Sequence, residues 1–472
     1  MRRTKIICTL GPATESEEII EGLCLGGMNV ARLNFSHNTH ADHKMRIDAV
    51  KKVRERLSLP IAIMLDTKGP EYRIKTFRDK KITLTEGDEF TFTAREVEGD
   101  GSIVSVSYKD LPRELESGDV ILLNNGLLSF RVESIEGEDI KCKVTCGGVL
   151  SDRKSMSFPG KVMHQPYLSV ADREDIKFGA MEGVDFIACS FVSGAGDLVA
   201  VKEYLHEIGA EGIELIAKIE NQSGFDNIEE ILDECDGIMI ARGDMGVEIP
   251  YEQLPYIQKK LITKGRMHGK IVITATEMLE SMTENPRPTR AEISDVANAV
   301  YDGSSAIMLS GETAAGKYPV EAVKAMAKIA ETTEGNIKYT KRFRKAGADF
   351  ETRSITDAVS HATCTMAIDT HARAIVACSL SGNTARMVSR FRSPVDIIAL
   401  TADERTWRKL ALSWGVIPAM CEMFTSSDVL FYTAKKTAQK LLSLEHGERI
   451  VITGGVTTGE SGNTNLIKID TV

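Results

Sequence analysis

One pattern recurs through most of the chain: a short apolar run, one or two polar residues, and then a segment with helical spacing. Helix-like segments such as 16–27 and 227–235 follow most of these runs. Repeated strand–helix units predict a parallel sheet, and eight of them predict a closed (β/α)8 barrel. A doubly wound open sheet uses the same units, and periodicity alone does not separate the two. The eight strand candidates are 5–10, 28–33, 61–66, 184–189, 213–218, 237–241, 271–275 and 305–310.

Two regions break this rhythm. Residues 71–160 consist of alternating runs joined by Gly-Asp and Asn-Gly turns, which predicts an all-β module inserted after the third barrel strand. Strands and helices alternate again from about residue 345, after a linker expected at 339–347. We therefore expect a catalytic TIM barrel formed by 1–70 and 161–344, an inserted β-barrel lid domain at 71–160, and a C-terminal α/β regulatory domain at 345–472.

Composition excludes several classes of protein. The 58 Lys and Arg against 68 Asp and Glu give a net charge of −10, which argues against bulk nucleic-acid binding. No run of about 18 apolar residues is present, so we expect no membrane span. The nine cysteines are dispersed, which is typical of reduced thiols in a cytoplasmic protein.

Polar residues follow the predicted strands where buried runs do not need them. Carboxyl ends of the strands in a parallel barrel carry the chemistry, so these residues are expected to converge on one face. They are Arg32, Asn34, Ser36, Asp66, Thr67, Lys68, Lys218, Glu220, Arg242, Asp244, Thr276 and Ser310.

The residue types at these tips suit phosphoryl transfer. Glu220 and Asp244 offer two carboxylates for Mg²⁺, which typically takes one or two from the protein. Arg32, Arg73 and Lys218 offer cations, and phosphoryl transfer depends mainly on positioning and charge neutralisation. An alternative is that Lys218 and Glu220 form a buried ion pair, which we rank lower because such pairs require good geometry.

Two motifs resemble sites without being convincing ones. The segment 311–318, GETAAGKY, fits a P-loop except at its end, where Tyr318 replaces the metal-binding Ser or Thr. The segment 37–43, HNTHADH, is better interpreted as a capping box of Thr39 and Asp42. His40 and His43 are then expected to face solvent.

Six long segments are specific enough to compare with known families. They are ARLNFSHNTH (31–40), LDTKGPEYR (65–73), AKIENQSGFDNIEEI (217–231), GIMIARGDMGVEIP (237–250), NPRPTRAEISDVANAVYDG (285–303) and IMLSGETAAGKYP (307–319). These segments resemble the pyruvate kinase family, and the resemblance runs essentially from end to end. It implies the barrel, and it implies transfer of the phosphoryl group of phosphoenolpyruvate to ADP, giving pyruvate and ATP in glycolysis.

The resemblance also implies residue roles. Arg32 would contact the transferred phosphate, and Lys218 would stabilise charge on the phosphoryl group and the enolate. Thr276 would lie near the face where the enolate carbon is protonated, with Ser310 a weaker candidate for the proton path. The substrate would also be bound at Ala241, Arg242, Gly243 and Asp244, the nucleotide at Asn34, His37 and Arg73, Mg²⁺ or Mn²⁺ at Glu220 and Asp244, and K⁺ at Asn34, Ser36, Asp66 and Thr67.

Glu71 resembles the residue of the potassium-dependent members, so we expect K⁺ activation. Departures from the family concentrate in the insert, where Asn124-Asn125 replaces the usual Asp-Asp and 152–160 is unusual. In the barrel, Glu277 and Ser305 replace the usual Gln and Asp.

The C-terminal region carries a second set of signals. Ser379, Ser381, Asn383 and Thr384 stand at a strand end, and Gly459 and Gly462 belong to a Gly-rich loop. Such loops suit a phosphate, so we expect an effector site for a sugar phosphate or a nucleotide. The resemblance further implies a homotetramer. Two other classes stay open at this point: another Mg-dependent barrel enzyme acting on phosphoenolpyruvate or a 2-oxo acid, and a catalytically silent sensing homologue.

Overall fold

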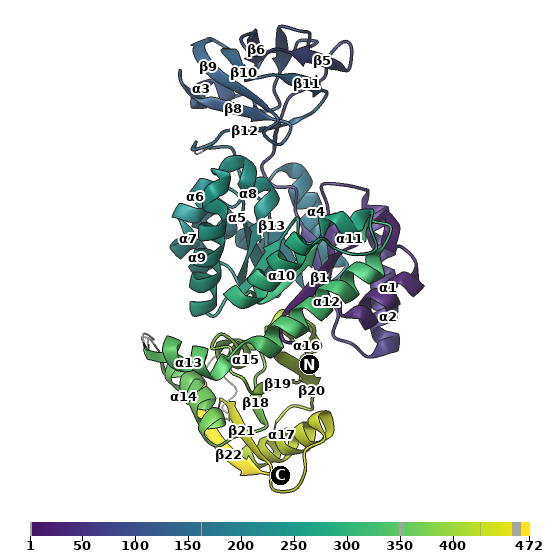
Figure 1. Cartoon of the computed structure of the whole chain (residues 1–472), viewed down its shortest axis with the longest axis vertical. Coiled ribbons are helices and arrows are strands. Elements are labelled where there is room, and N and C mark those ends of the chain that lie inside the picture. Colours follow the sequence, from purple (N-terminus) through teal and green to yellow (C-terminus); the bar gives the residue numbers. More distant parts are fainter. Residues whose placement is uncertain (1, 162, 349–351, 353, 425, 456–463) are drawn as a thin grey trace.

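The computed structural model describes residues 2–161, 163–348, 352, 354–424, 426–455 and 464–472. Its three parts are stacked along the long axis of the molecule (Figure 1), with the barrel in the middle. The β-rich insert stands at one end, over the carboxyl ends of the barrel strands, and the C-terminal domain lies at the other end.

Eight parallel strands close into a barrel in the order β1-β17-β16-β15-β14-β13-β3-β2. Each coincides with one of the eight predicted runs, so the TIM barrel is confirmed and the open sheet is excluded. The strands are β1 (Lys5–Thr9), β2 (Val30–Asn34), β3 (Ala62–Asp66), β13 (Phe186–Cys189), β14 (Glu214–Ile219), β15 (Gly237–Ala241), β16 (Ile271–Ala275) and β17 (Ala306–Leu309).

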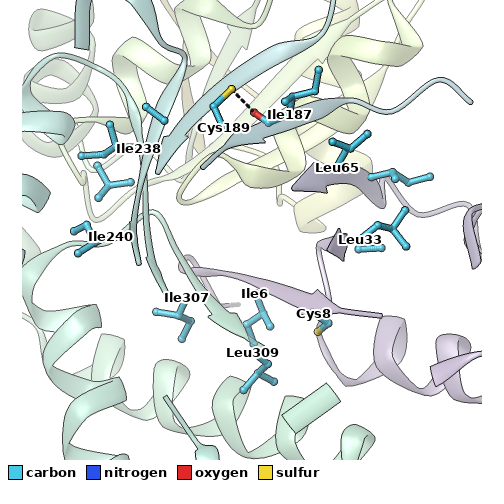
Figure 2. Packing of buried hydrophobic residues seen from close by; sticks show 14 of the residues in the cluster. Ile6, Cys8, Leu33, Leu65, Ile187, Cys189, Ile238, Ile240, Ile307 and Leu309 are labelled. Atoms are coloured by element: carbon cyan, nitrogen blue, oxygen red, sulfur yellow. Dashed lines mark hydrogen bonds between the residues drawn. The ribbon is translucent and has the colours of Figure 1, made fainter. Parts of the chain in front are cut away.

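Alternate residues of these strands belong to two separate cores. Ile7, Phe186 and Ile216 pack inside the barrel, whereas their neighbours point outward against the helices. Figure 2 shows this outer layer, with Ile6 beside Leu309 and Cys189 beside Ile187. Because both faces are buried, the strands are mainly apolar between their two ends.

Helices cover the barrel, and several begin at a side-chain cap. Thr39 and Asp42 form the predicted capping box of α2. His43 does not face solvent as expected: it is 1% exposed, and its ring stacks on Phe35. The helices are α1 (Glu17–Gly26), α2 (His40–Leu57), α4 (Val170–Met181), α5 (Ala195–Glu207), α6 (Gln222–Asp226), α7 (Ile228–Glu234), α8 (Arg242–Glu248), α9 (Leu254–Met267), α10 (Arg290–Asp302), α11 (Gly311–Ala314) and α12 (Pro319–Asn336), with short 3-10 turns η1 (Pro12–Thr14), η2 (Tyr251–Gln253) and η3 (Glu280–Thr283).

The insert is all-β apart from one helical turn, α3 (Leu111–Glu114). Its core is formed by Phe90, Phe92 and Phe130, whose rings pack edge to face or tilted. A seven-stranded sheet has the order β4-β12-β8-β9-β10-β6-β7, and β11 pairs with β5. The strands are β4 (Tyr72–Arg73), β5 (Lys81–Leu84), β6 (Glu89–Thr93), β7 (Ile103–Ser105), β8 (Val120–Leu123), β9 (Leu128–Glu136), β10 (Asp139–Cys146), β11 (Gly148–Ser151) and β12 (Ser155–Ser157).

The C-terminal domain is a five-stranded sheet, β20-β19-β18-β21-β22, with only β22 antiparallel. The expected linker at 339–347 is instead helical, because α13 buries Tyr339 and Phe343 on one face. This helix crosses the predicted boundary at 344/345, and the domain limits stay predictions. The elements are α13 (Tyr339–Ala348), α14 (Ile355–Asp369), β18 (Ala374–Cys378), α15 (Asn383–Ser389), β19 (Asp396–Thr401), α16 (Glu404–Lys409), η4 (Leu410–Leu412), β20 (Val416–Met420), α17 (Ser427–Leu442), β21 (Arg449–Gly454) and β22 (Leu466–Thr471).

Within the described part of the chain, no helix is both long enough and apolar enough to cross a membrane.

Candidate active site

A cavity of about 590 Å³ lies between the carboxyl ends of the barrel strands and the insert. Eight of the residues predicted for this face line it: Arg32, Asn34, Ser36, His37, Lys68, Arg73, Lys218 and Asp244. The insert contributes Asn124, Asn125, Lys154, Ser155 and Ser157 to the same lining, and Lys161 follows directly after it. Asp66, Thr67 and Glu220 do not line the cavity but are buried against residues that do.

Lys218 is the best-anchored cation of the cavity wall. Its Nζ lies 2.6 Å from Ser190 Oγ, 3.1 Å from Asp66 Oδ1 and 3.0 Å from Glu220 Oε1. Lys218 and Glu220 therefore form the buried ion pair that we ranked below a substrate and metal role for these two residues. Burial alone would lower the pKa of Lys218, but the carboxylates of Asp66 and Glu220 raise it above its ordinary value. The ammonium is thus charged and held in one place.

Arg32 is fixed beside Lys218 through a shared carboxylate. Its Nε donates to Asp66 Oδ2 at 2.6 Å, and its Nη1 donates to Thr9 Oγ1 at 2.8 Å. Burial would raise the pKa of Asp66, but Arg32 and Lys218 together hold it below its usual value. One buried aspartate therefore orients two cations toward the cavity.

One carboxylate oxygen of Glu220 receives no hydrogen bond. Its Oε2 accepts the Phe191 N–H at 2.6 Å, whereas its Oε1 has no hydrogen bond apart from the Lys218 ion pair. Burial, with Asp244 nearby, raises the pKa of Glu220 to about 7, although Lys218 opposes the shift. A buried carboxylate oxygen without a hydrogen bond, next to the exposed Asp244, fits a divalent cation that takes further oxygens from substrate and water. No group of three or more His, Cys, Asp or Glu that could hold a metal occurs in the described residues.

The turn after β15 is tied to the turn after β16. The Gly243 N–H donates to Thr276 Oγ1 at 2.8 Å, and Thr276 has a left-handed backbone with φ of 68°. Arg242 is directed away from the cavity and donates to Asp295 Oδ1 at 2.8 Å and to the Thr276 carbonyl at 2.7 Å. Arg242 therefore holds the two turns together, and none of Ala241, Arg242, Gly243 and Thr276 lines the cavity directly.

Ser310 lies beyond the cavity lining, at the end of β17. Its Oγ is buried without a hydrogen-bond partner, and its backbone N–H donates to Glu312 Oε2 at 2.7 Å. Glu312 is fully buried and also accepts the Leu279 N–H at 2.9 Å. Ser310 thus has a free hydroxyl but is not brought next to Lys218 in this structure.

The four predicted K⁺ ligands lie at the adjoining tips of β2 and β3. Asn34 Oδ1 accepts the Ser36 N–H at 3.1 Å, and Thr67 Oγ1 accepts the Ser190 N–H at 3.2 Å. All four side chains present oxygen, which is the donor that hard cations take. Nearby, Glu71 pairs with Arg73 and, at 3.4 Å, with Lys68.

Sequence reasoning missed Ser190, Phe191 and Glu248. Ser190 follows β13 directly and bonds to both Lys218 and Asp66, so the strand-tip rule could have found it. Phe191 has a left-handed backbone with φ of 57°, which turns its N–H toward Glu220. Glu248 lines the cavity from α8, and burial raises its pKa to about 7. Nothing in the sequence singled out the last two.

The predicted effector residues are divided. Ser379, Ser381, Asn383 and Thr384 lie between the end of β18 and the first turn of α15. Thr384 Oγ1 lies 2.8 Å from Thr464 Oγ1, so this turn contacts the far end of the Gly-rich loop. Gly459 and Gly462 lie outside the described residues.

Comparisons with known proteins agree over the whole chain. The model of the pyruvate kinase barrel domain matches residues 1–323, and that of the pyruvate kinase alpha/beta domain matches 357–470. A pyruvate kinase of Clostridium acetobutylicum is 46% identical over 473 residues, covering all of both chains. One of Staphylococcus saprophyticus is 48% identical over 474 residues, covering all of this chain and 81% of the relative. A crystal structure of a pyruvate kinase from Cryptosporidium parvum superposes with a TM-score of 0.95 at 37% identity, covering 100% of this chain and 96% of that one. The chain therefore belongs to the pyruvate kinase family, the phosphotransferases of glycolysis with the number EC 2.7.1.40.

Proposed function

We propose that the cavity between the barrel and the insert is where this chain transfers the phosphoryl group of phosphoenolpyruvate to ADP, giving pyruvate and ATP. The observation that carries this assignment is the charged Lys218 ammonium on the cavity wall, held by Ser190, Asp66 and Glu220. Charge that grows on the phosphoryl group and on the enolate oxygen in the transition state would meet a cation already in position.

Other residues would bind and orient the substrates. Arg32, fixed by Asp66, would bind the phosphate of phosphoenolpyruvate. His37 and Arg73 line the same cavity and would contact the nucleotide together with Asn34. The backbone from Ala241 to Asp244 would approach the substrate carboxylate. Thr276 would serve the protonation of the enolate carbon, with Ser310 on the proton path.

Members of this family generally use a divalent cation and K⁺. Glu220 and Asp244 would hold Mg²⁺ or Mn²⁺, and Asn34, Ser36, Asp66 and Thr67 would hold K⁺. The divalent ion, when bound, would supply positive charge to the phosphoryl oxygens. The Phe191 N–H fixes one oxygen of Glu220 and leaves the other available.

One coupled assay tests the central assignment: phosphoenolpyruvate and ADP with Mg²⁺ and K⁺, following pyruvate. Lys218→Met should lower kcat by about 10²–10³-fold or more, because the charge is needed mainly in the transition state. Binding of phosphoenolpyruvate, measured by calorimetry, should persist. Lys264→Met, on the outer surface of the barrel at α9, is the matched control and should keep its activity. Near-normal turnover of Lys218→Met would overturn the assignment.

Glu71 leads to a separate prediction about K⁺. A carboxylate at position 71, unlike a lysine, brings no positive charge of its own to the nearby oxygen ligands, so a monovalent cation should supply that charge. We expect turnover to fall strongly when K⁺ is replaced by tetramethylammonium at constant ionic strength. A Glu71→Lys variant should depend less on K⁺. Equal rates with and without K⁺ in the unmodified chain would show that the prediction is wrong.

We further propose a homotetramer and an effector site around Ser379, Ser381, Asn383 and Thr384, the latter for a sugar phosphate or a nucleotide. The contact between Thr384 and Thr464 supports the effector site, because it joins two loops of the kind that bind phosphate. Sedimentation tests the tetramer, and a flat kinetic response to sugar phosphates and AMP would contradict the effector site.

A cytoplasmic location is also proposed, because all nine cysteines are free thiols and seven of them are buried.

A further inference from the structure

Arg392 is a buried cation with only neutral partners. The residue is 5% exposed, and it lies between the C-terminal domain and the amino-terminal end of the barrel. Its Nη1 donates to the Ser389 carbonyl at 2.9 Å, and its Nη2 donates to the Gly303 carbonyl and to Ser305 Oγ, both at 2.9 Å. Its Nε has no partner. Among the residues that the structure describes, no carboxylate pairs with this guanidinium.

The nearest charges do not neutralise it. Burial first, and then the cation of Arg266, lowers the pKa of Arg392 well below its ordinary value. Glu334 acts only from a distance, and its carboxylate is engaged by the backbone N–H groups of Arg3 and Thr4 at 2.8 Å and 2.6 Å. A buried charge without a counter-charge is costly, so this arrangement requires compensation from elsewhere.

The backbone of Arg392 has an energetically unfavourable conformation. Arg392 has a φ of 53°, in the left-handed region that residues other than glycine rarely adopt. The guanidinium also lies over the Trp414 ring, 4.8 Å from its centroid. The hydrogen bonds and the Trp414 ring therefore fix the position of the guanidinium and offset the unfavourable backbone conformation.

A small cavity adjoins it. Its volume is about 10 Å³, enough for one particle the size of a water molecule. Its lining holds three serines and no carboxylate. Ser413 is 2% exposed, and its Oγ has no hydrogen-bond partner. Four cationic side chains line the cavity: Lys270, Arg386, Arg390 and Arg392. Two of them are already paired, Arg386 with Glu214 and Arg390 with Asp357, both at 2.6 Å.

We propose that this interdomain cavity binds one monatomic anion, chloride in the cell, between the Arg392 guanidinium and the Ser413 hydroxyl. Nε–H and O–H donors without partners suit an acceptor, and the Arg392 charge, which no carboxylate pairs in the described residues, favours an anion over water. The space admits about one water-sized particle, which is closer in size to a monatomic halide than to phosphate, sulfate or a carboxylate, each of at least three heavy atoms. The ion would join the C-terminal domain, through Arg392, to the barrel, through Ser305 and Lys270. This assignment is independent of the proposed catalytic roles.

Bromide provides a direct test, because it substitutes for chloride and scatters anomalously. Crystals of the full chain soaked in sodium bromide should show an anomalous peak inside this cavity. Ser305→Asp should abolish the peak, because Ser305 Oγ lies 2.9 Å from Nη2 and a carboxylate at this position would take the place of the anion. If that variant fails to fold, Ser413→Ala serves instead, and the peak should weaken. Absence of a peak in the unmodified chain would overturn the proposal.

Thermal unfolding gives a second readout in solution. The unmodified chain in potassium chloride should melt at a higher Tm than in potassium gluconate of equal ionic strength. The rise should saturate, reaching about 1–2 °C at ten times the Kd. Ser305→Asp should lose the chloride dependence, whereas Arg78→Ala, an exposed arginine of the insert, should keep it. A chloride effect of unchanged size in Ser305→Asp would place the ion elsewhere and overturn the assignment.

Discussion

At the scale of single residues, Lys218 depends on its neighbours for its position. The Ser190 hydroxyl lies 2.6 Å from Nζ and donates to the Thr67 carbonyl at 2.6 Å, so it ties the lysine to the loop after β3. Ser190 is 1% exposed and lines the cavity beside Lys218. We interpret it as a positioning residue.

Ser190→Ala should therefore lower kcat by about 10-fold or more while changing the KM for phosphoenolpyruvate little. The reason is that Asp66 and Glu220 keep the ammonium charged, but the orientation toward the phosphoryl group becomes looser. Steady-state kinetics of the variant measure the split between kcat and KM. Ser193→Ala removes a nearby hydroxyl that has no bond to Lys218 and should stay close to the unmodified rate. Equal losses in both variants would contradict the positioning role.

The sequence predicted which residues gather at the barrel face, but not how they are connected. Polar tips after apolar runs are visible in one dimension, and Arg32, Asp66, Lys218 and Glu220 are found together as expected. The bond from Phe191 to Glu220 is not visible, because it depends on a left-handed backbone at a residue that usually avoids it. The ion pair between Lys218 and Glu220 is not visible in the sequence for a similar reason. The position of Lys218 also depends on Asp66 in β3 and on Ser190 after β13.

At the scale of elements, the barrel strands were predictable because both of their faces are buried. The helix α13 was not predicted, because its sequence is mainly basic. Its only buried apolar residues in the described part are Tyr339 and Phe343, four positions apart. The strands β4 and β12 were also not predicted, because they have only two and three residues. Short strands and charged helices owe their structure to what they pack against, and a single sequence does not show that partner.

The helix α2 allows a prediction about pH. His43 is enclosed on this helix: Nε2 bonds to the His37 carbonyl at 2.9 Å, and Arg46, His40 and Asp42 are its charged neighbours. Burial lowers the pKa of His43 to about 4, against an ordinary value of 6.5. The neutral ring is therefore favoured in the native state. Its contribution to stability is full above pH 6.5 and is lost as the pH falls from 6.5 toward 4.

A His43→Phe variant keeps the stacking on Phe35 but cannot titrate. The loss of stability between pH 7.5 and pH 5 should be smaller in this variant, by up to about 2 kcal/mol. Calorimetric Tm values across that range measure it. His206→Gln replaces an exposed histidine of α5, 82% exposed, and should leave the pH dependence unchanged. If the His43→Phe and unmodified curves run parallel, His43 is not the group that titrates.

At the scale of the whole molecule, β14 links the active site to the C-terminal domain. Lys218 stands near its carboxyl end, and Glu214 stands at its first position, at the opposite end of the barrel. Glu214 accepts two hydrogen bonds from Arg386 of α15, at 2.6 Å and 2.8 Å, and pairs with Lys409 of α16 at 2.9 Å. Burial would raise the pKa of Glu214, but these two cations hold it below its usual value.

Glu214→Gln should consequently weaken the joint between the two domains. Arg386 and Lys409 would be left buried without a counter-charge, which costs on the order of 3–5 kcal/mol for such a pair. We expect differential scanning calorimetry to show an earlier unfolding transition for the C-terminal domain, separated from that of the barrel. The kcat at 25 °C should stay near that of the unmodified chain, because Lys218 keeps all of its own partners. Glu404→Gln removes a pair with Arg408 that lies within α16 and should shift neither transition. A single transition at the original Tm in Glu214→Gln would show that the domains are joined mainly by other contacts.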